Sequence, residues 1–164
     1  MSVTRPMRRL GWLLVLLLGV VGCDYTTKAL ALSELPRSGP VSVVPGLVEL
    51  RYVTNTDTAF SVLGHLFGPS ERFWIVVVAQ TVANLALIVW VVSRRHQPGL
   101  LERAAGALLV GGGFGNLLDR LVRGHVIDFI HVSYWPVFNV ADAAICLGIG
   151  LLLWSRRRRP GLNV

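Results

Sequence analysis

Charged residues are scarce in this sequence. Asp, Glu, Lys and Arg make up 15% of the 164 residues, whereas 53% are hydrophobic. A soluble domain of ordinary composition carries about 25% charged residues. The length suits one domain covering residues 1–164. The shortage of charge therefore argues against a water-exposed globular protein and indicates a surface that faces lipid.

Cysteine and acidic residues are also few. The two cysteines, Cys23 and Cys146, both lie in apolar runs, which argues against a disulfide framework. Nine acidic residues stand against 16 basic ones, giving a formal net charge of +7. The arginines flank apolar runs and form no basic face with interleaved aromatics, so we interpret them as topology signals and expect no nucleic-acid partner.

Four apolar segments predict a mainly α-helical membrane protein with four transmembrane helices. A helix needs about 20 mostly apolar residues to cross the bilayer. The expected spans are about residues 10–32, 73–92, 104–118 and 137–154. Ten of the 16 basic residues fall before the first span, between the second and third, or after the fourth. Because such segments stay inside, we expect both termini in the cytoplasm and two extracytoplasmic loops, about residues 33–72 and 119–136.

The first outer loop is too long for a plain connector. Val41, Val43 and Val44 precede a Pro-Gly turn signal, and the residues after it alternate apolar with polar over 48–52. This period of two predicts a small extracytoplasmic β-sheet. Residues 64–73 are rich in aromatic and apolar side chains, which predicts a short interfacial helix.

The N-terminus admits a second interpretation. A basic start, an apolar run and Val20-Val21-Gly22-Cys23 are similar to a lipobox, in which Cys23 would be lipidated and the chain would itself be a lipoprotein. Three further membrane segments follow, however, whereas a typical lipoprotein is soluble beyond its anchor. We therefore favour a first transmembrane helix.

Polar residues gather at the predicted outer ends of the spans. Ionisable groups at membrane depth are costly, which makes them functional candidates. Four separate stretches of the sequence bring such groups to one depth, the outer interface. They are Asp24, Lys28, Asn116, Asp119, Arg120, Asp128, Asn139 and Asp142.

Asp128 and Asp142 are the candidates for chemistry. Asp142 lies inside the fourth predicted span, and Asp128 is flanked by apolar residues in the second outer loop. Two carboxylates brought close would share a proton, one acting as base on a water and the other as acid toward a carbonyl. Such a pair hydrolyses a peptide bond without a metal. The alternative is a structural ion pair of Asp142 with Arg120 or Lys28.

A metal site is a further alternative. His125, Asp128 and His131 are spaced three apart, and histidine with carboxylate suits zinc. Neither a His-x-x-x-His motif nor a cysteine pair supports it. The sequence also admits a small transporter or an inactive membrane scaffold. A transport pathway would need polar residues through the whole membrane thickness, whereas the inner halves of spans one and four are apolar. An inactive relative would have lost one aspartate, whereas both are present in this chain.

Four short motifs resemble those of one family, lipoprotein signal peptidase (signal peptidase II). Their order and spacing agree with it over nearly the whole chain. They are Asp24-Tyr25-Thr26-Thr27-Lys28, Gly115-Asn116-Leu117-Leu118-Asp119-Arg120, Val126-Ile127-Asp128-Phe129-Ile130 and Phe138-Asn139-Val140-Ala141-Asp142-Ala143-Ala144-Ile145.

The resemblance implies a polytopic aspartic endopeptidase of the bacterial inner membrane, acting as a monomer without metal or cofactor. It would cleave the signal peptide from diacylglyceryl-modified prolipoproteins just before the lipidated cysteine. The resemblance makes Asp128 and Asp142 the catalytic pair, and Asp119 a residue that orients its neighbour. It also implies supporting residues of a lipid-facing cleft: Asn116, Arg120, Asn139, Asp24, Lys28 and Asn55.

One position departs from the family pattern. The family usually has Asn-x-Gly-Ala-Ala-Phe in the first outer loop, whereas this chain has Asn55-Thr56-Asp57-Thr58-Ala59-Phe60. Glycine takes positive φ freely and aspartate does so less readily. Asp57 also adds negative charge to a loop expected near the substrate, so loop geometry and substrate preference are where this chain should differ.

Overall fold

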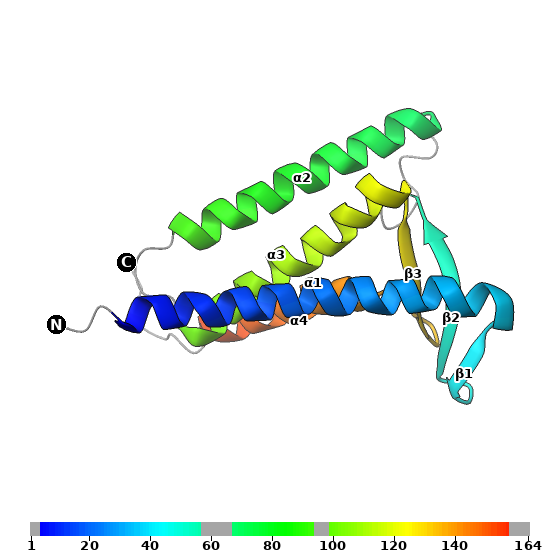
Figure 1. Ribbon diagram of the computed structural model, residues 1–164, viewed down its shortest axis with the longest axis horizontal. Helices are drawn as coiled ribbons and strands as arrows, with labels where there is room; N and C mark the ends of the chain where they lie inside the picture. Colours follow the sequence, from blue (N-terminus) through cyan, green and yellow to red (C-terminus); the bar gives the residue numbers. More distant parts are fainter. Residues whose placement is uncertain (1–3, 57–66, 94–98, 158–164) are drawn as a thin grey trace.

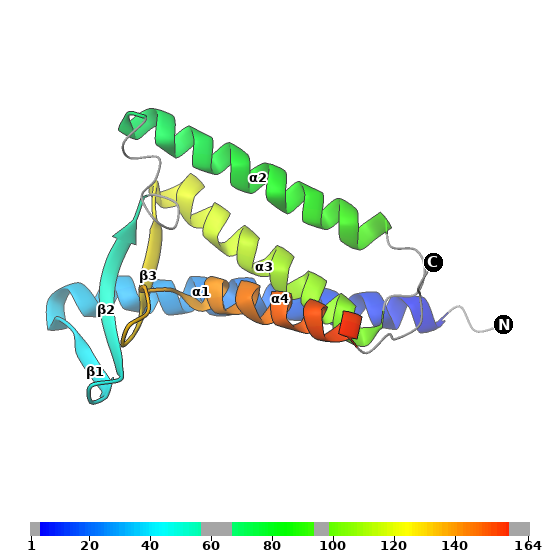
Figure 2. The same ribbon diagram turned by 180° about the vertical axis from the view of Figure 1, so that it is seen from behind.

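Four helices and three strands make up the structure, a computed structural model that describes residues 4–56, 67–93 and 99–157 and, for residues 4–10, the backbone alone. In chain order the elements are α1 (Thr4–Ser38), β1 (Val41–Val44), β2 (Val48–Asn55), α2 (Pro69–Ser93), α3 (Leu100–Arg123), β3 (Val126–Val132) and α4 (Val140–Arg157). The strands form a sheet across one end of the helices, and α1 begins and α4 ends at the other end (Figures 1 and 2).

Helix α3 is the centre of the helical part, since it packs against α1, α2 and α4. Its glycines allow the close approaches. A Cβ on Gly112 would lie 2.5 Å from the carbonyl oxygen of Ala141 in α4, so only glycine fits there. Gly113 lies directly against the side chain of Asn84 in α2. Helix α2 packs mainly on α3 and diverges from α1 and α4 toward the sheet end (Figure 1).

The sheet confirms the strand prediction for the first outer loop. Strands β1 and β2 form an antiparallel hairpin around the turn at residues 45–47, where Gly46 has a φ of 73°. Strand β3 pairs antiparallel with β2, which gives the order β1-β2-β3. The sequence analysis did not predict β3. Its apolar residues Ile127 and Phe129 pack with Ala31 and Leu35 of α1, which anchors the sheet to the helices.

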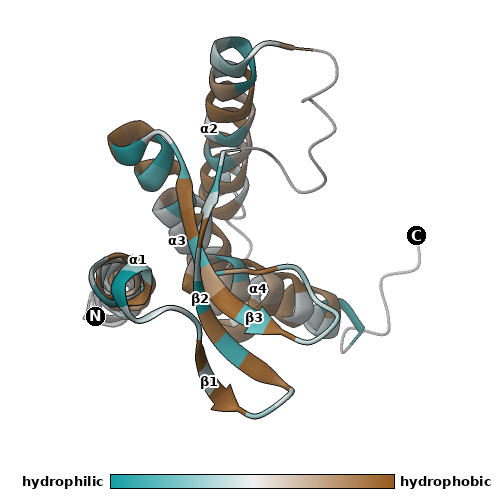
Figure 3. Cartoon of the chain, turned by 90° about the vertical axis from the view of Figure 1, so that its right-hand side faces the viewer, coloured by the Kyte–Doolittle hydropathy of each residue, from teal (hydrophilic) through white to brown (hydrophobic). Residues whose placement is uncertain are grey.

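Among the residues that the structure describes, two helices are long and apolar enough to cross a membrane. They are Gly11–Ser38 within α1 and Pro69–Ser93, with mean hydropathies of 1.6 and 2.4. Large apolar side chains are exposed along the helices, as Trp12, Val82 and Val89 illustrate, and Figure 3 shows long stretches of α2 in the hydrophobic colour. An apolar outer surface of this kind is typical of a protein that lies in lipid. That all four helices span the membrane stays a prediction.

Two details differ from the expected arrangement. Residues 67 and 68 are not helical, and residues 69–73 form the first turns of α2, so the described part of that stretch contains no separate interfacial helix; residues 64–66 lie outside it. The fourth helix begins at Val140 rather than near residue 137, because Phe138 is bonded to Ile130 in an isolated β-bridge. Asp57 also lies outside the described residues.

Candidate active site

Asp142 is fixed by the start of α4. Asn139 caps this helix, since its side-chain oxygen accepts a hydrogen bond from the Asp142 N–H at 3.0 Å. The Asp142 carboxylate accepts one from the Asn139 N–H at 3.2 Å in return. This reciprocal pair is a capping box, built here from Asn and Asp. The capping geometry therefore holds the half-buried Asp142 side chain at the sheet end of the helix.

Asp128 reaches the same place from strand β3. Asp128 is 3% exposed, and each of its carboxylate oxygens accepts a hydrogen bond from an asparagine amide. Asn139 Nδ2 donates at 2.6 Å, and Asn55 Nδ2, from the end of β2, donates at 2.9 Å. Asn139 therefore binds Asp128 through its side chain and Asp142 through its backbone, which joins the two predicted catalytic residues through one residue.

Asn116 of α3 extends the network. Its amide nitrogen donates to Asp142 at 2.7 Å, while its amide oxygen accepts from Asn139 Nδ2 at 3.1 Å and from Lys28 Nζ at 2.9 Å. The amide thus points its donor at the carboxylate and its acceptor at the cation. This arrangement fixes the orientation of an otherwise symmetric-looking group.

Lys28, fully buried, also pairs with Asp24 at 2.7 Å and with Asp119 at 2.8 Å. A buried ammonium needs such partners, because an unpaired charge would be strongly disfavoured there. Asp119 further contacts Arg123 and the Ile127 N–H. Lys28 thus forms its ion pairs with Asp24 and Asp119. Asp142 accepts hydrogen bonds from neutral N–H groups instead. The alternative interpretation of the sequence, in which Lys28 forms a structural ion pair with Asp142, is therefore wrong.

Arg120 lies beside this network. Its Nη1 donates to Gln80 of α2 at 2.8 Å, and Gln80 in turn donates to the Gly113 carbonyl at 2.9 Å. Arg120 also donates to the Asn116 carbonyl at 3.4 Å. Sequence reasoning missed Gln80 as a partner. Its signal was weak, a polar residue in an otherwise apolar run, one turn before Asn84.

Burial raises the pKa of Asp128 above its usual value, and the nearby charge of Asp142 raises it further. The hydrogen bonds from Asn55 and Asn139 act in the opposite direction, since donors favour the ionised carboxylate. The net rise favours a proton on this carboxyl.

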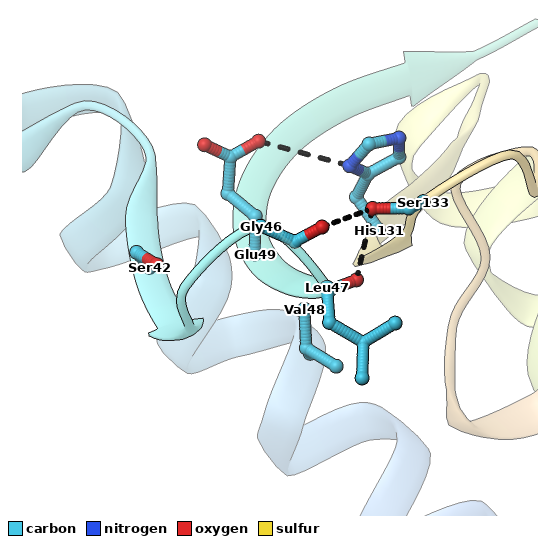
Figure 4. Close-up of a pocket in the computed structure, with 7 residues that line it drawn as sticks. All are labelled: Ser42, Gly46, Leu47, Val48, Glu49, His131 and Ser133. Atoms are coloured by element: carbon cyan, nitrogen blue, oxygen red, sulfur yellow. Dashed lines mark hydrogen bonds and ion pairs between the residues drawn. The ribbon is translucent and has the colours of Figure 1, made fainter.

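His131 is turned away from the aspartates. Asp128 and His131 are three apart on β3 and hence on opposite faces of the strand. The His131 ring faces Glu49 at 3.7 Å, in a pocket of about 140 Å³ at the far end of the sheet, where Ser133 donates to the Gly46 carbonyl at 2.6 Å (Figure 4). Within residues 4–56, 67–93 and 99–157, no three His, Cys, Asp or Glu side chains form a group suited to a metal ion.

All eight predicted site residues lie at the sheet end of the helices. Seven are joined in one hydrogen-bond network, and Arg120 contacts it through the backbone of Asn116. The network joins Asp24, Lys28, Asn55, Asn116, Asp128, Asn139 and Asp142. Of these, Asp24, Lys28, Asn116, Asp128 and Asn139 are buried. Burying so many polar groups costs free energy unless each has a hydrogen-bond partner. A dense, fully hydrogen-bonded cluster of this kind is typical of a functional site.

Comparisons with known proteins give one family. The family model described as signal peptidase (SPase) II matches residues 16–157. The chain is 39% identical to the lipoprotein signal peptidase of Pseudoalteromonas translucida, covering 88% of this chain and 85% of that one. It is 38% identical to the lipoprotein signal peptidase of Xylella fastidiosa strain 9a5c, covering 96% and 98%.

A solved bacterial membrane enzyme has a similar fold, with a TM-score of 0.76 at 25% identity, covering 92% of this chain and 95% of that one. Together with the two long apolar helices, this likeness indicates a membrane protein. The match of the family model covers most of the chain and includes every residue of the hydrogen-bond network. This chain belongs to the signal peptidase II family.

Proposed function

We propose that this protein is a membrane-embedded aspartic endopeptidase that removes the signal peptide from diacylglyceryl-modified prolipoproteins, cutting just before the lipidated cysteine. The observation that supports the aspartic mechanism is the position of Asn139, which is hydrogen-bonded to both Asp128 and Asp142. The substrate class is taken from the family and from relatives named lipoprotein signal peptidase.

The two carboxyl groups would divide the work of hydrolysis. One, ionised, removes a proton from a water whose oxygen attacks the carbonyl carbon of the scissile bond. The other, protonated, donates to the carbonyl oxygen, which gives a neutral tetrahedral diol. Return of a proton to the amide nitrogen breaks the C–N bond and releases the signal peptide as an acid and the lipidated cysteine as an amine. No metal or cofactor takes part in these steps.

The raised pKa of Asp128 makes this residue the better candidate for the group that carries the shared proton. Asp142 accepts N–H bonds from both Asn116 and Asn139, which suits an ionised carboxylate. The amide donors of Asn116 and Asn139 are held by further hydrogen bonds, so they need little reorganisation as charge moves during the reaction.

We further propose that all four helices cross the bacterial inner membrane, with both termini in the cytoplasm and the site at the extracytoplasmic side. Arginines at the ends of the chain support this orientation, because cytoplasmic flanks carry Lys and Arg. The sheet lies at the opposite end of the helices (Figure 1), and two residues of the polar network, Asn55 and Asp128, belong to its strands. One chain supplies every member of the network, so we propose a monomer as the active form.

The test is cleavage of a synthetic prolipoprotein peptide by the purified full chain in detergent or nanodiscs. The peptide carries a diacylglyceryl cysteine, and mass spectrometry identifies the products. We expect one cut, on the N-terminal side of that cysteine, at an unchanged rate in excess chelator. The same peptide without the lipid is the control and should be a poor substrate. Cleavage elsewhere, or loss of cleavage in chelator, would contradict the proposal.

A further inference from the structure

The two segments that carry Asp128 and Asp142 are held in the same way. In each, the backbone N–H of the residue just before the aspartate donates to a buried carboxylate that belongs to a different element of the fold. The Ala141 N–H donates to Asp24 Oδ1 at 2.9 Å, and the Ile127 N–H donates to Asp119 Oδ2 at 3.4 Å. Asp24 belongs to α1 and Asp119 to α3.

One ammonium group joins these two carboxylates. Lys28 Nζ lies 2.7 Å from Asp24 Oδ2 and 2.8 Å from Asp119 Oδ2. An ammonium has three N–H donors, and the third donates to Asn116 Oδ1 at 2.9 Å. Asn116 Nδ2 in turn donates to Asp142. Each of the three residues bonded to Lys28 is therefore also hydrogen-bonded to a segment that carries a predicted catalytic aspartate.

Burial makes this connection rigid. Lys28 is 0% exposed, Asp24 1% and Asp119 2%. Removing Lys28 would leave Asp24 without its cation, and removing either acid would leave the buried ammonium with a single carboxylate partner, so the three groups hold one geometry. Gly115 helps to close it, since a Cβ there would lie 2.6 Å from Asp24 Oδ2. Lys28 is also the only lysine in the chain.

From this geometry we infer that Lys28, Asp24 and Asp119 are positioning residues that set the separation between Asp128 and Asp142. The inference deepens the proposed function and rests on it. None of the three needs to touch the substrate. Their role is to fix the start of α4 against strand β3, so that one water fits between the two carboxyl groups. A separation error of about 1 Å is enough to reduce turnover strongly.

The same substitution at the two acids should have unequal effects. Asp24 uses one oxygen for Lys28 and the other for the Ala141 N–H, so an asparagine must turn its NH₂ toward one of these donors. Asp119 uses a single oxygen, Oδ2, for both Lys28 and the Ile127 N–H, so an asparagine oxygen can replace it. Its other oxygen faces Arg123, which is partly exposed and can turn to water.

The experiment measures kcat and KM for Asp24→Asn and Asp119→Asn with the lipidated peptide. Both variants lose one negative charge at an almost fully buried site. We expect Asp24→Asn to lower kcat by about 10²-fold and Asp119→Asn by less than about 10-fold, with KM changed by less than about threefold in both. Arg123→Gln, which leaves the contacts of Lys28 intact, is the control and should retain kcat. Equal losses, or wild-type turnover in Asp24→Asn, would overturn the inference.

A second measurement needs no variant that folds poorly. Because Lys28 is the only lysine, selective ¹⁵N-lysine labelling of the wild-type protein gives one side-chain signal. We expect its ammonium protons to exchange slowly with water and the signal to shift in Asp142→Asn, whose side chain it reaches through Asn116. Fast exchange, as in a free lysine, would refute the arrangement.

The two proposals fail differently. If Asp128→Asn and Asp142→Asn are inactive while both Asp24→Asn and Asp119→Asn behave as wild type, the positioning role is wrong and the proposed function stands. If the variants at Asp128 and Asp142 cleave normally, the proposed function itself is wrong.

Discussion

Replacing Gly112 by alanine should displace Asp142 without touching it. The added Cβ would lie 2.5 Å from the Ala141 carbonyl oxygen and 2.8 Å from Ile145 Cγ1. The Ile145 side chain can rotate, but the carbonyl belongs to the backbone of α4, one residue before Asp142. Ordinary contact begins at 3.4 Å, so the start of α4 must move by about 0.9 Å, and an error of about 1 Å costs about 10²-fold in rate. We therefore expect kcat to fall by about 10²-fold.

The assay is steady-state cleavage of the lipidated peptide, with the folded fraction checked by size-exclusion chromatography. Gly150→Ala is the matched control. It also replaces a helical glycine by alanine, but in α4, at a position where a Cβ would meet nothing within 4 Å. It should retain full activity and stabilise the helix slightly, by at most about 1 kcal/mol. A Gly112→Ala variant with wild-type kcat would refute the claim that packing of α3 on α4 sets the position of Asp142.

Three other variants test separate parts of the account. Asn55→Ala removes a hydrogen bond that lowers the pKa of Asp128, so that pKa should rise and the alkaline limb of kcat/KM should move to higher pH; a shift to lower pH would contradict this. Asn139→Ala should abolish turnover and, through loss of the helix cap, lower the free energy of unfolding by about 1 kcal/mol, measured by thermal melting. Gly124→Ala should lower the free energy of unfolding by about 1–2 kcal/mol in the same measurement, because Gly124 ends α3 with a φ of 79°, and Gly124→Asn should lower it less. Equal melting temperatures of the wild type and both variants would contradict the role of the positive φ.

Much of the helical fold could be predicted from the sequence. Long apolar runs and flanking arginines indicated four helices, and the alternation after Pro45-Gly46 predicted the β1–β2 hairpin. Strand β3 was missed because its sequence, Val126 to Val132, is mostly apolar, is interrupted by Asp128 and His131, and shows no clear period of two over its buried half. Its strand form depends on pairing with β2, which lies about 75 residues earlier in the chain, and no local pattern reports such a pairing.

The members of the site could be predicted, whereas their connections could not. Burial cost alone marks Asp24, Lys28 and Asp142 as unusual in apolar segments. Sequence reasoning offered Lys28 as a partner for Asp142, but the lysine pairs with Asp24 and Asp119. This choice depends on the angle at which α1 meets α3, which is set by side-chain packing across the helices and leaves no trace in residue spacing.

The most direct test of the account is the turnover of three variants: Asp128→Asn, Asp142→Asn and the double replacement. If the two carboxyl groups act as one unit, each single variant should lose essentially all cleavage of the lipidated peptide, and the double variant should lose no more than either. The network that holds them, through Asn116 and Asn139, should keep each variant folded. A folded single variant that still cleaves at the wild-type rate would contradict the catalytic pair.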